Sequence, residues 1–221
     1  MSRDLILDKL RRNAAGGQSR AEREKAVAKR IRSASRGVLP AQPRAATARV
    51  TQFMEKAEAA QATTVMTTRT GVAEAIADWL RAHNLPAEIR TGKDERLKAL
   101  LGGKAGNLIL RQGPSDGTDT TGVSHAECGV CETGTLIVLS GADNPTTLNF
   151  LPQNHIVVLR RSDILAHYED IWPRLRTAYG KGQMPRTVNM ITGPSRSADI
   201  EQTLLLGAHG PVRLHIVIVR D

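Results

Sequence analysis

The stretch TTVMTTRTGVAEAIADWLRAH, residues 63–83, decides the fold class. Its first part, Thr63–Thr68, is rich in β-branched residues and predicts a strand. The second part, Thr70–His83, predicts a helix, because apolar residues recur at helical spacing from Val72 to Leu80. A strand that is followed directly by an amphipathic helix is the repeating unit of α/β folds.

The same alternation continues on both sides of this stretch. Ala46–Ala60 predicts a helix with Phe53 on its apolar face, and Ser162 predicts the start of another, with a break or a fresh start at Pro173. Short apolar runs predict further strands at Glu88–Arg90, Leu108–Leu110, Leu136–Leu139, Ile156–Leu159, Val188–Ile191 and Leu214–Val219. We therefore expect a Rossmann-like, mostly parallel sheet flanked by helices, which the last run closes.

The positive charge of the chain is concentrated at its N-terminus. The net charge is +9, yet residues 1–44 hold 12 basic and 4 acidic side chains, so the remainder is nearly neutral. A basic protein suggests a nucleic-acid partner. Because the body is nearly neutral and only six residues are aromatic, base-stacking platforms are poorly supplied, which disfavours a nucleic-acid partner.

Residues 1–44 are predicted to form a basic helical arm with a linker, and residues 45–221 an α/β domain. Within the arm, Ser19 and Glu22 have the spacing of a helix capping box, and Ser33–Pro43 has the composition of a linker. The apolar stripes of the arm favour docking onto its own domain, onto a second copy in a homo-oligomer, or onto a partner. A solvated arm is the alternative.

Composition excludes several classes of protein. No apolar run is long enough for a membrane span, and the start of the chain carries acids without a small-residue cleavage site, so we expect a cytoplasmic protein. Cys128 and Cys131 have C-x-x-C spacing without a second pair. His125 or His155 would be needed to complete a zinc site, and we expect no metal and no cofactor in this chain.

Three polar, glycine-containing segments lie at the ends of predicted strands. They are Gly122–Thr135 (GVSHAECGVCETGT), Thr187–Glu201 (TVNMITGPSRSADIE) and the tight turn Leu206–Pro211 (LGAHGP). Ligands of open α/β sheets bind beyond the carboxyl ends of strands, which favours a site at the second segment. No G-x-G-x-x-G or P-loop motif is present.

Read together, these segments resemble the lactate-utilisation protein C family, built on the LUD domain. The resemblance covers about residues 60–221 and rests on four motifs in order: Glu132-Thr133-Gly134-Thr135, Leu151-Pro152 with His155-Ile156-Val157-Val158, Gly193-Pro194-Ser195 with Ala198-Asp199-Ile200-Glu201, and Gly207-Ala208-His209-Gly210-Pro211.

The resemblance implies a fold similar to that of ribose-5-phosphate isomerases, glucosamine-6-phosphate deaminases and CoA transferases. It also implies a part in bacterial oxidation of L-lactate to pyruvate, beside an iron–sulfur subunit and a cysteine-rich oxidoreductase subunit. Since this chain has only two cysteines, any iron–sulfur clusters would belong to those partners.

The candidate site residues come from the same segments. Glu132 is a candidate acid/base or nucleophile or else a structural turn residue, and His209 is a candidate general base or a ring that fixes its turn. Arg196 suits a carboxylate or phosphate, whereas Asp199 and Glu201 are typical of a helix N-terminus. The candidate ligand-binding residues, for a small anion, are Thr133, Gly134, Thr135, Gly193, Pro194, Ser195, Arg196, Ser197 and Asp199.

Three functions are compatible with these features. The first is an accessory subunit of an L-lactate oxidation system that binds a small anionic ligand or cofactor, with the chemistry not carried by this chain alone. The second is a self-sufficient transferase or isomerase that uses Glu132 as nucleophile or base, by analogy of fold. The third is nucleic-acid binding through the basic arm.

Overall fold

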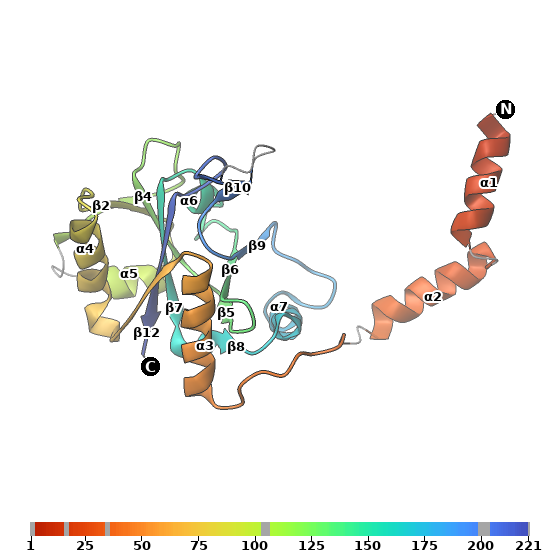
Figure 1. The fold of residues 1–221 in the computed structure, drawn as a ribbon, viewed down its shortest axis with the longest axis horizontal. Coiled ribbons are helices and arrows are strands. Elements are labelled where there is room, and N and C mark those ends of the chain that lie inside the picture. Colours follow the sequence, from red (N-terminus) through yellow and green to blue (C-terminus); the bar gives the residue numbers. More distant parts are fainter. Residues whose placement is uncertain (1–2, 16–17, 34–35, 103–106, 199–203, 221) are drawn as a thin grey trace. The chain divides into compact units, whose positions relative to one another are not determined.

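The computed structural model describes residues 3–15, 18–33, 36–102, 107–198 and 204–220 (Figure 1). The chain divides into two compact units, Met1–Leu39 and Pro40–Asp221. Among the described residues, no helix combines the length and the apolar character that crossing a bilayer requires.

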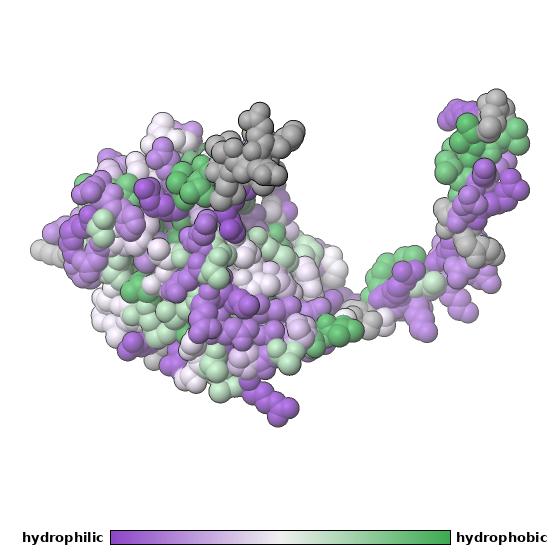
Figure 2. Space-filling model, viewed as in Figure 1, coloured by the Kyte–Doolittle hydropathy of each residue, from purple (hydrophilic) through white to green (hydrophobic). Residues whose placement is uncertain are grey.

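The N-terminal unit contains two helices, α1 (Arg3–Ala15) and α2 (Arg20–Ser33). The predicted capping box is confirmed: the Ser19 backbone N–H donates to Glu22 Oε2 at 2.7 Å, and the Glu22 backbone N–H donates to Ser19 Oγ at 3.2 Å. Both helices are mostly hydrophilic, with small apolar patches (Figure 2). These patches include Leu10, which is 58% exposed, and Ile31, which is 69% exposed.

The second unit contains a parallel sheet of six strands in the order β1-β12-β7-β4-β2-β3. This confirms the predicted fold class, a mostly parallel sheet flanked by helices. Its strands are β1 (Thr63–Thr67), β2 (Glu88–Thr91), β3 (Ile109–Gln112), β4 (Thr121–His125), β7 (Asn154–Arg160) and β12 (Arg213–Val219).

Helices cover both faces of this sheet. On one face, Val157 and Leu159 of β7 pack with Phe53 of α3 (Ala46–Ala59). On the other face, Ile156 and Val158 pack with residues of α4 (Val72–Ala82) and α5 (Glu95–Leu101). Successive side chains of a strand point to opposite faces, so a strand buried on both faces is apolar throughout.

A second, mixed sheet has the order β8-β5-β6-β9, which corrects the expectation of one central sheet. β5 (Cys128–Val130) and β6 (Thr135–Leu139) are joined by residues 131–134 only, and a connection this short permits only antiparallel pairing. β9 (Val188–Ile191) is antiparallel to β6, and β8 (Ile164–Leu165) is parallel to β5.

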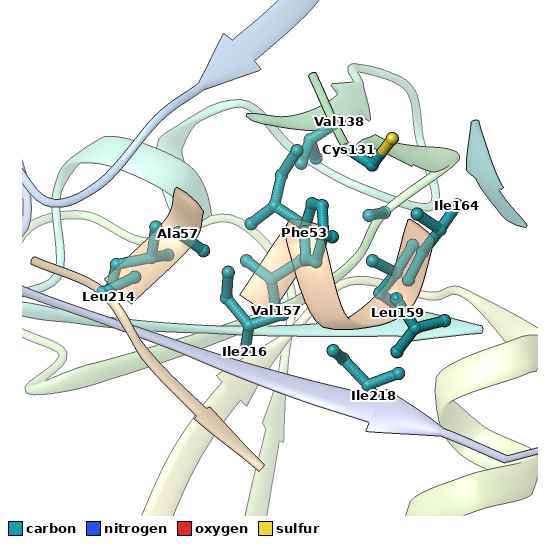
Figure 3. Packing of buried hydrophobic residues seen from close by; sticks show 14 residues of the cluster. Phe53, Ala57, Cys131, Val138, Val157, Leu159, Ile164, Leu214, Ile216 and Ile218 are labelled. Carbon is teal, nitrogen blue, oxygen red and sulfur yellow. The ribbon is translucent and has the colours of Figure 1, made fainter. Parts of the chain in front are cut away.

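Phe53 lies between the two sheets (Figure 3). Its cluster contains Val157 and Ile216 from the parallel sheet together with Cys131 and Val138 from the region of the second sheet. A separate cluster joins the second sheet to α7 (Ile171–Tyr179), and burial there raises the pKa of Cys128 to about 12. The Cys128 thiol is therefore an apolar packing group at neutral pH.

Several predicted elements differ from the observed ones. Gly122–Thr135, interpreted as a polar segment before a strand, forms the two buried strands β4 and β5. The glycines of these strands interrupt the apolar pattern that predicts a strand, and close packing requires them. A Cβ on Gly122 would lie 2.6 Å from the Leu148 carbonyl oxygen, and one on Gly129 would lie 2.8 Å from Phe53 Cε2. β12 does not close the sheet but lies between β1 and β7.

The helix predicted from Ser162 begins later. The chain forms a 3-10 turn at Arg161–Asp163, then β8, then a second 3-10 turn at Tyr168–Asp170 before α7. Pro173 lies in the first turn of α7 without breaking it, because N–H groups there have no partner within the helix.

The segment after Pro194 does not begin a helix over its described part. Arg196–Ala198 forms β10, which pairs with β11 (Leu204–Leu206) in a small antiparallel ribbon. The remaining short helix, α6 (Thr147–Phe150), leads into β7.

Candidate functional site

A cavity of about 220 Å³ lies near the amino ends of β7 and β12. We call it the Gly193 cavity. It brings two of the predicted segments together, the turn after β9 and the turn before β12, with α6 and the first residues of both strands. Its lining consists of Asn149, Phe150, His155, Met190, Ile191, Thr192, Gly193, Pro194, Ser195, His209, Gly210, Pro211 and Leu214.

This position differs from the expected one. The segment Thr187–Glu201 does follow a strand, but that strand is β9 of the second sheet. The rule that ligands bind beyond carboxyl ends applies to the parallel sheet, and the Gly193 cavity lies at the opposite, amino end of that sheet, where His155 is the second residue of β7.

Two residues of the lining, His155 and Asn149, are joined by hydrogen bonds through the buried side chain of Ser124, which lies outside the lining. His155 Nε2 lies 3.0 Å from Ser124 Oγ, and Ser124 Oγ donates to Asn149 Oδ1 at 2.8 Å. All three residues are at most 1% exposed. Asn149 Nδ2 is a buried donor with no partner among the described residues. Since buried donors are normally satisfied, Asn149 is a lining residue whose hydrogen bonding is incomplete within the described part of the chain.

His155 is neutral at physiological pH, because burial lowers its pKa to about 3. A neutral imidazole has one N–H and one lone pair. Ser124 partners the ring of His155, and the ring also lines the cavity.

Behind the cavity wall, hydroxyl groups of the Glu132–Thr135 motif form a network. Thr135 Oγ1 lies 2.6 Å from Thr192 Oγ1 and 2.6 Å from Tyr168 Oη, and Thr133 Oγ1 lies 2.7 Å from Thr135 Oγ1. Thr135 is fully buried. The network reaches the cavity only through Thr192, so Thr133 and Thr135 support the wall and do not line it.

Glu132 also lies outside the lining of the Gly193 cavity. It belongs to the turn between β5 and β6, where its Oε2 is buried without a hydrogen-bond partner among the described residues. The negative charge of Glu132 contributes to the raised pKa of Cys131, for which burial is the larger cause.

The motif glycines pack against α3. Gly134 and Gly193 have φ values of +70° and +73°, which favour glycine. A Cβ on Gly134 would lie 2.3 Å from the Ala57 backbone nitrogen, and one on Gly193 would lie 2.1 Å from the Ala60 carbonyl oxygen. Two motifs that are distant in sequence therefore make close backbone contacts at the C-terminal end of the same helix, Gly134 with Ala57 and Gly193 with the C-cap residue Ala60.

The other predicted ligand-binding residues are dispersed. Pro194, Ser195 and His209 line the cavity. Arg196 and Ser197 lie on β10 outside the lining, and the Arg196 side chain is exposed. Asp199 and Glu201 lie outside the described residues.

Sequence reasoning missed Asn149 and Ser124. Asn149 belongs to a helix of four residues, and Ser124 lies in a strand whose sequence resembles a loop. Neither residue belongs to a sequence motif that indicates a function. Only the folded structure shows that Ser124 and Asn149 are hydrogen-bond partners. The proline and asparagine residues around 145–149 predict a turn region at most.

The family model of the LUD domain matches residues 115–219. This part of the chain is similar to the LUD domain family. The match confirms the resemblance predicted from the four motifs, and it contains the segments that form the Gly193 cavity. The parallel sheet extends beyond it, since β1 and β2 precede residue 115.

Two proteins of other bacteria are similar to part of this chain. Lactate utilization protein C of Geobacillus sp. (strain WCH70) is 34% identical over 101 residues, which are 45% of this chain and 42% of that protein. Uncharacterized protein YkgG of Escherichia coli (strain K12) is 37% identical over 101 residues, 45% of this chain and 44% of that protein. The aligned residues thus span less than half the length of these relatives.

The fold is shared more widely. The crystal structure of a DUF162 family protein from Deinococcus radiodurans superposes with a TM-score of 0.57 at 19% identity, covering 80% of this chain and 99% of that chain. The similarity of fold therefore includes strands and helices outside the LUD domain match.

Stability is expected to fall with decreasing pH because three buried histidines are neutral. Burial is the largest cause that lowers the pKa of His155 to about 3 and those of His125 and His215 to about 4. An unfolded histidine binds a proton below about pH 6.5. The unfolded chain thus takes up protons that the native chain excludes, and stability is lost as pH falls from about 6.5 towards 4.

Each such histidine contributes about 1.4 kcal/mol per pH unit to the slope of the free energy of unfolding against pH in this range. His215→Gln is expected to reduce the slope of unfolding free energy against pH by about that amount, measured by denaturant unfolding across this range. An unchanged slope would show that His215 is protonated in the native protein.

Proposed function

We propose that this chain takes part in lactate utilisation in the cytoplasm and binds a small carboxylate, of the 2-hydroxy acid class, in the Gly193 cavity. A role in lactate utilisation is supported by relatives that are named Lactate utilization protein C. The observation that carries the ligand class is Asn149 Nδ2, a buried donor without a partner among the described residues, in the same lining as His155 and Ser195.

A carboxylate is the complement of this lining. The amide N–H of Asn149 and the hydroxyl of Ser195 are donors, and a carboxylate offers only acceptors. Within the described part of the chain no Asp or Glu lines the cavity, so no like charge there opposes an anion. Neutral His155 donates its one N–H to Ser124 Oγ, because Ser124 gives its own hydrogen to Asn149. The second ring nitrogen therefore accepts, and the hydroxyl of a 2-hydroxy acid is a donor that suits it.

The proposal also includes partner proteins that carry the redox chemistry, an iron–sulfur subunit and a cysteine-rich oxidoreductase subunit. Both cysteines of this chain are buried, and burial raises the pKa of each thiol. Thiolates are the cluster ligands, so groups held as neutral thiols are poor ones. Clusters of the system would therefore reside in the partners.

Asn149→Asp is the test of the ligand site. The substitution preserves shape and the oxygen that accepts from Ser124, and it replaces the open donor with an acceptor. A lost hydrogen bond to a charged group costs about 1.5–3 kcal/mol, so the affinity for L-lactate measured by calorimetry is expected to fall at least about tenfold. Gln183→Glu adds the same charge at an exposed position and is expected to leave binding unchanged.

The same variants test the process in cells. A deletion strain is expected to lose growth on L-lactate, to regain it with the wild-type or Gln183→Glu gene, and to regain it poorly with Asn149→Asp. Full growth of the deletion strain would refute the role in lactate utilisation, whereas full rescue by Asn149→Asp would refute only the ligand site.

A further inference from the structure

Apolar residues from three separate elements line one part of the Gly193 cavity. Phe150 is the last residue of α6, Ile191 is the last residue of β9, and Leu214 belongs to β12. Ile191 is paired with Leu136 in the register of β6 and β9, and it packs against the same cluster that contains Leu214. The ligand class proposed above accounts for the polar part of the lining and leaves this apolar part without a function.

The polar and the apolar groups differ in depth. Asn149 and His155 are at most 1% exposed, whereas Phe150, the residue next to Asn149, is 40% exposed. All three line the cavity, so the two buried residues lie at its deep end and Phe150 lies at its rim. A ligand whose carboxylate is held at the deep end extends from there towards the rim that Phe150 borders.

The surroundings of Gly210 show that the ring of Phe150 and a polar group border the same space. A Cβ added to Gly210 would lie 3.6 Å from Ser195 Oγ and 3.9 Å from Phe150 Cδ1. Both are distances of ordinary van der Waals contact, so a carbon atom beside Gly210 touches the hydroxyl and the ring at once. A ligand that accepts a hydrogen bond from Ser195 thus has its hydrocarbon part within reach of Phe150.

The Gly193 cavity is also larger than L-lactate. Its volume of about 220 Å³ equals that of about seven molecules of liquid water, at about 30 Å³ each. L-lactate has three carbon and three oxygen atoms, and atoms that are bonded to one another occupy less space than separate water molecules. Space for further carbon atoms therefore remains when L-lactate is bound.

We propose that the preferred ligand of the Gly193 cavity is a 2-hydroxy acid whose apolar side chain is longer than the methyl group of L-lactate, and that Phe150 determines this preference. The inference rests on the proposed function, and L-lactate remains a ligand of the same site. The carboxylate and the hydroxyl bind at the polar end, and the side chain covers Phe150. Each methylene that is removed from water raises the affinity about fourfold.

Calorimetry of the full chain with a series of acids tests the preference. L-2-Hydroxyhexanoate, which has three more methylenes than L-lactate, is expected to bind at least about tenfold more tightly. L-Malate carries a second carboxylate where the longer acid carries hydrocarbon, and it is expected to bind no more tightly than L-lactate. The proposal is overturned if L-2-hydroxyhexanoate has no advantage over L-lactate, or if L-malate gains as much.

Phe150→Ala tests the residue that is assigned to this preference. The ratio of the affinities for L-2-hydroxyhexanoate and L-lactate is expected to fall at least about threefold, close to the value of one methylene. A change that weakens both acids equally leaves this ratio unaltered. Tyr179→Ala is the matched control, because it removes an aromatic ring that is 42% exposed from a residue outside the lining, and it is expected to keep the ratio. An unchanged ratio in Phe150→Ala would refute the role of Phe150.

The same titrations separate the two proposals. If L-lactate binds and the longer acid has no advantage, the preference for a longer side chain fails and the proposed function stands. If none of the 2-hydroxy acids binds, the ligand class of the proposed function fails, and the preference fails with it.

Discussion

Gly193→Ala is expected to destabilise the protein by about 2–5 kcal/mol. Left-handed backbone costs a residue with a Cβ about 1–2 kcal/mol, and overpacking of a close contact costs about 1–3 kcal/mol more. Both terms apply, since Gly193 has a φ of +73° and a Cβ there would lie 2.1 Å from the Ala60 carbonyl oxygen. Backbone atoms cannot rotate away as a flexible side chain can, so α3 or the turn must move.

The measurement is denaturant unfolding, with Gly182→Ala as the matched control. Gly182 has a φ of +81°, and a Cβ added there would meet no neighbouring atom within 4 Å, so only the backbone cost of about 1–2 kcal/mol is expected. If both variants lost the same stability, the contact with α3 would contribute nothing. Because Gly193 also lines the cavity, the Gly193→Ala variant is expected to weaken L-lactate binding as well.

Phe53→Ala is expected to cost about 3–5 kcal/mol, the range for a fully buried aromatic residue. Phe53 is 0% exposed and belongs to a cluster to which both sheets contribute (Figure 3). Its loss leaves a void that the sheets close only by moving together. The backbone of each sheet is fixed by its own hydrogen bonds, so relaxation into the void is limited.

Phe150→Ala is the control for Phe53→Ala, because it removes the same atoms from a residue that is 40% exposed. Because the Phe150 side chain is only partly removed from water in the native protein, its truncation loses less hydrophobic free energy and leaves no enclosed void. The loss of unfolding free energy, measured by denaturant unfolding, is expected to be less than half of that for Phe53→Ala. Equal losses would mean that Phe53 does not join the two sheets.

Much of the fold follows from local sequence pattern. β9 (Val188–Ile191) coincides with its predicted run, and α3 and β1 differ from theirs by one residue at the end. These elements have strong periodicity or β-branched composition. β4 and β5 were missed because Gly122, Ser124 and Gly129 interrupt the apolar pattern, and only their packing partners show why small residues are needed there.

Only those parts of the candidate site that have a local sequence signal could be predicted. The turn at Gly193–Ser195 and the one at His209 have visible glycine and proline signals, and both line the cavity. The donor of Asn149 has no local signal, since hydrogen-bond satisfaction depends on residues far away in the chain.

The alternation of strands and helices, the basic arm and the four LUD motifs could all be predicted from the amino-acid sequence, because each is encoded in neighbouring residues. Three features depend on the tertiary structure: β6 and β9 belong to a separate sheet, Gly134 and Gly193 pack closely against α3 and its C-cap residue Ala60, and two distant turns line one cavity. Strand pairing and burial are relations between distant segments, and a local pattern cannot specify them.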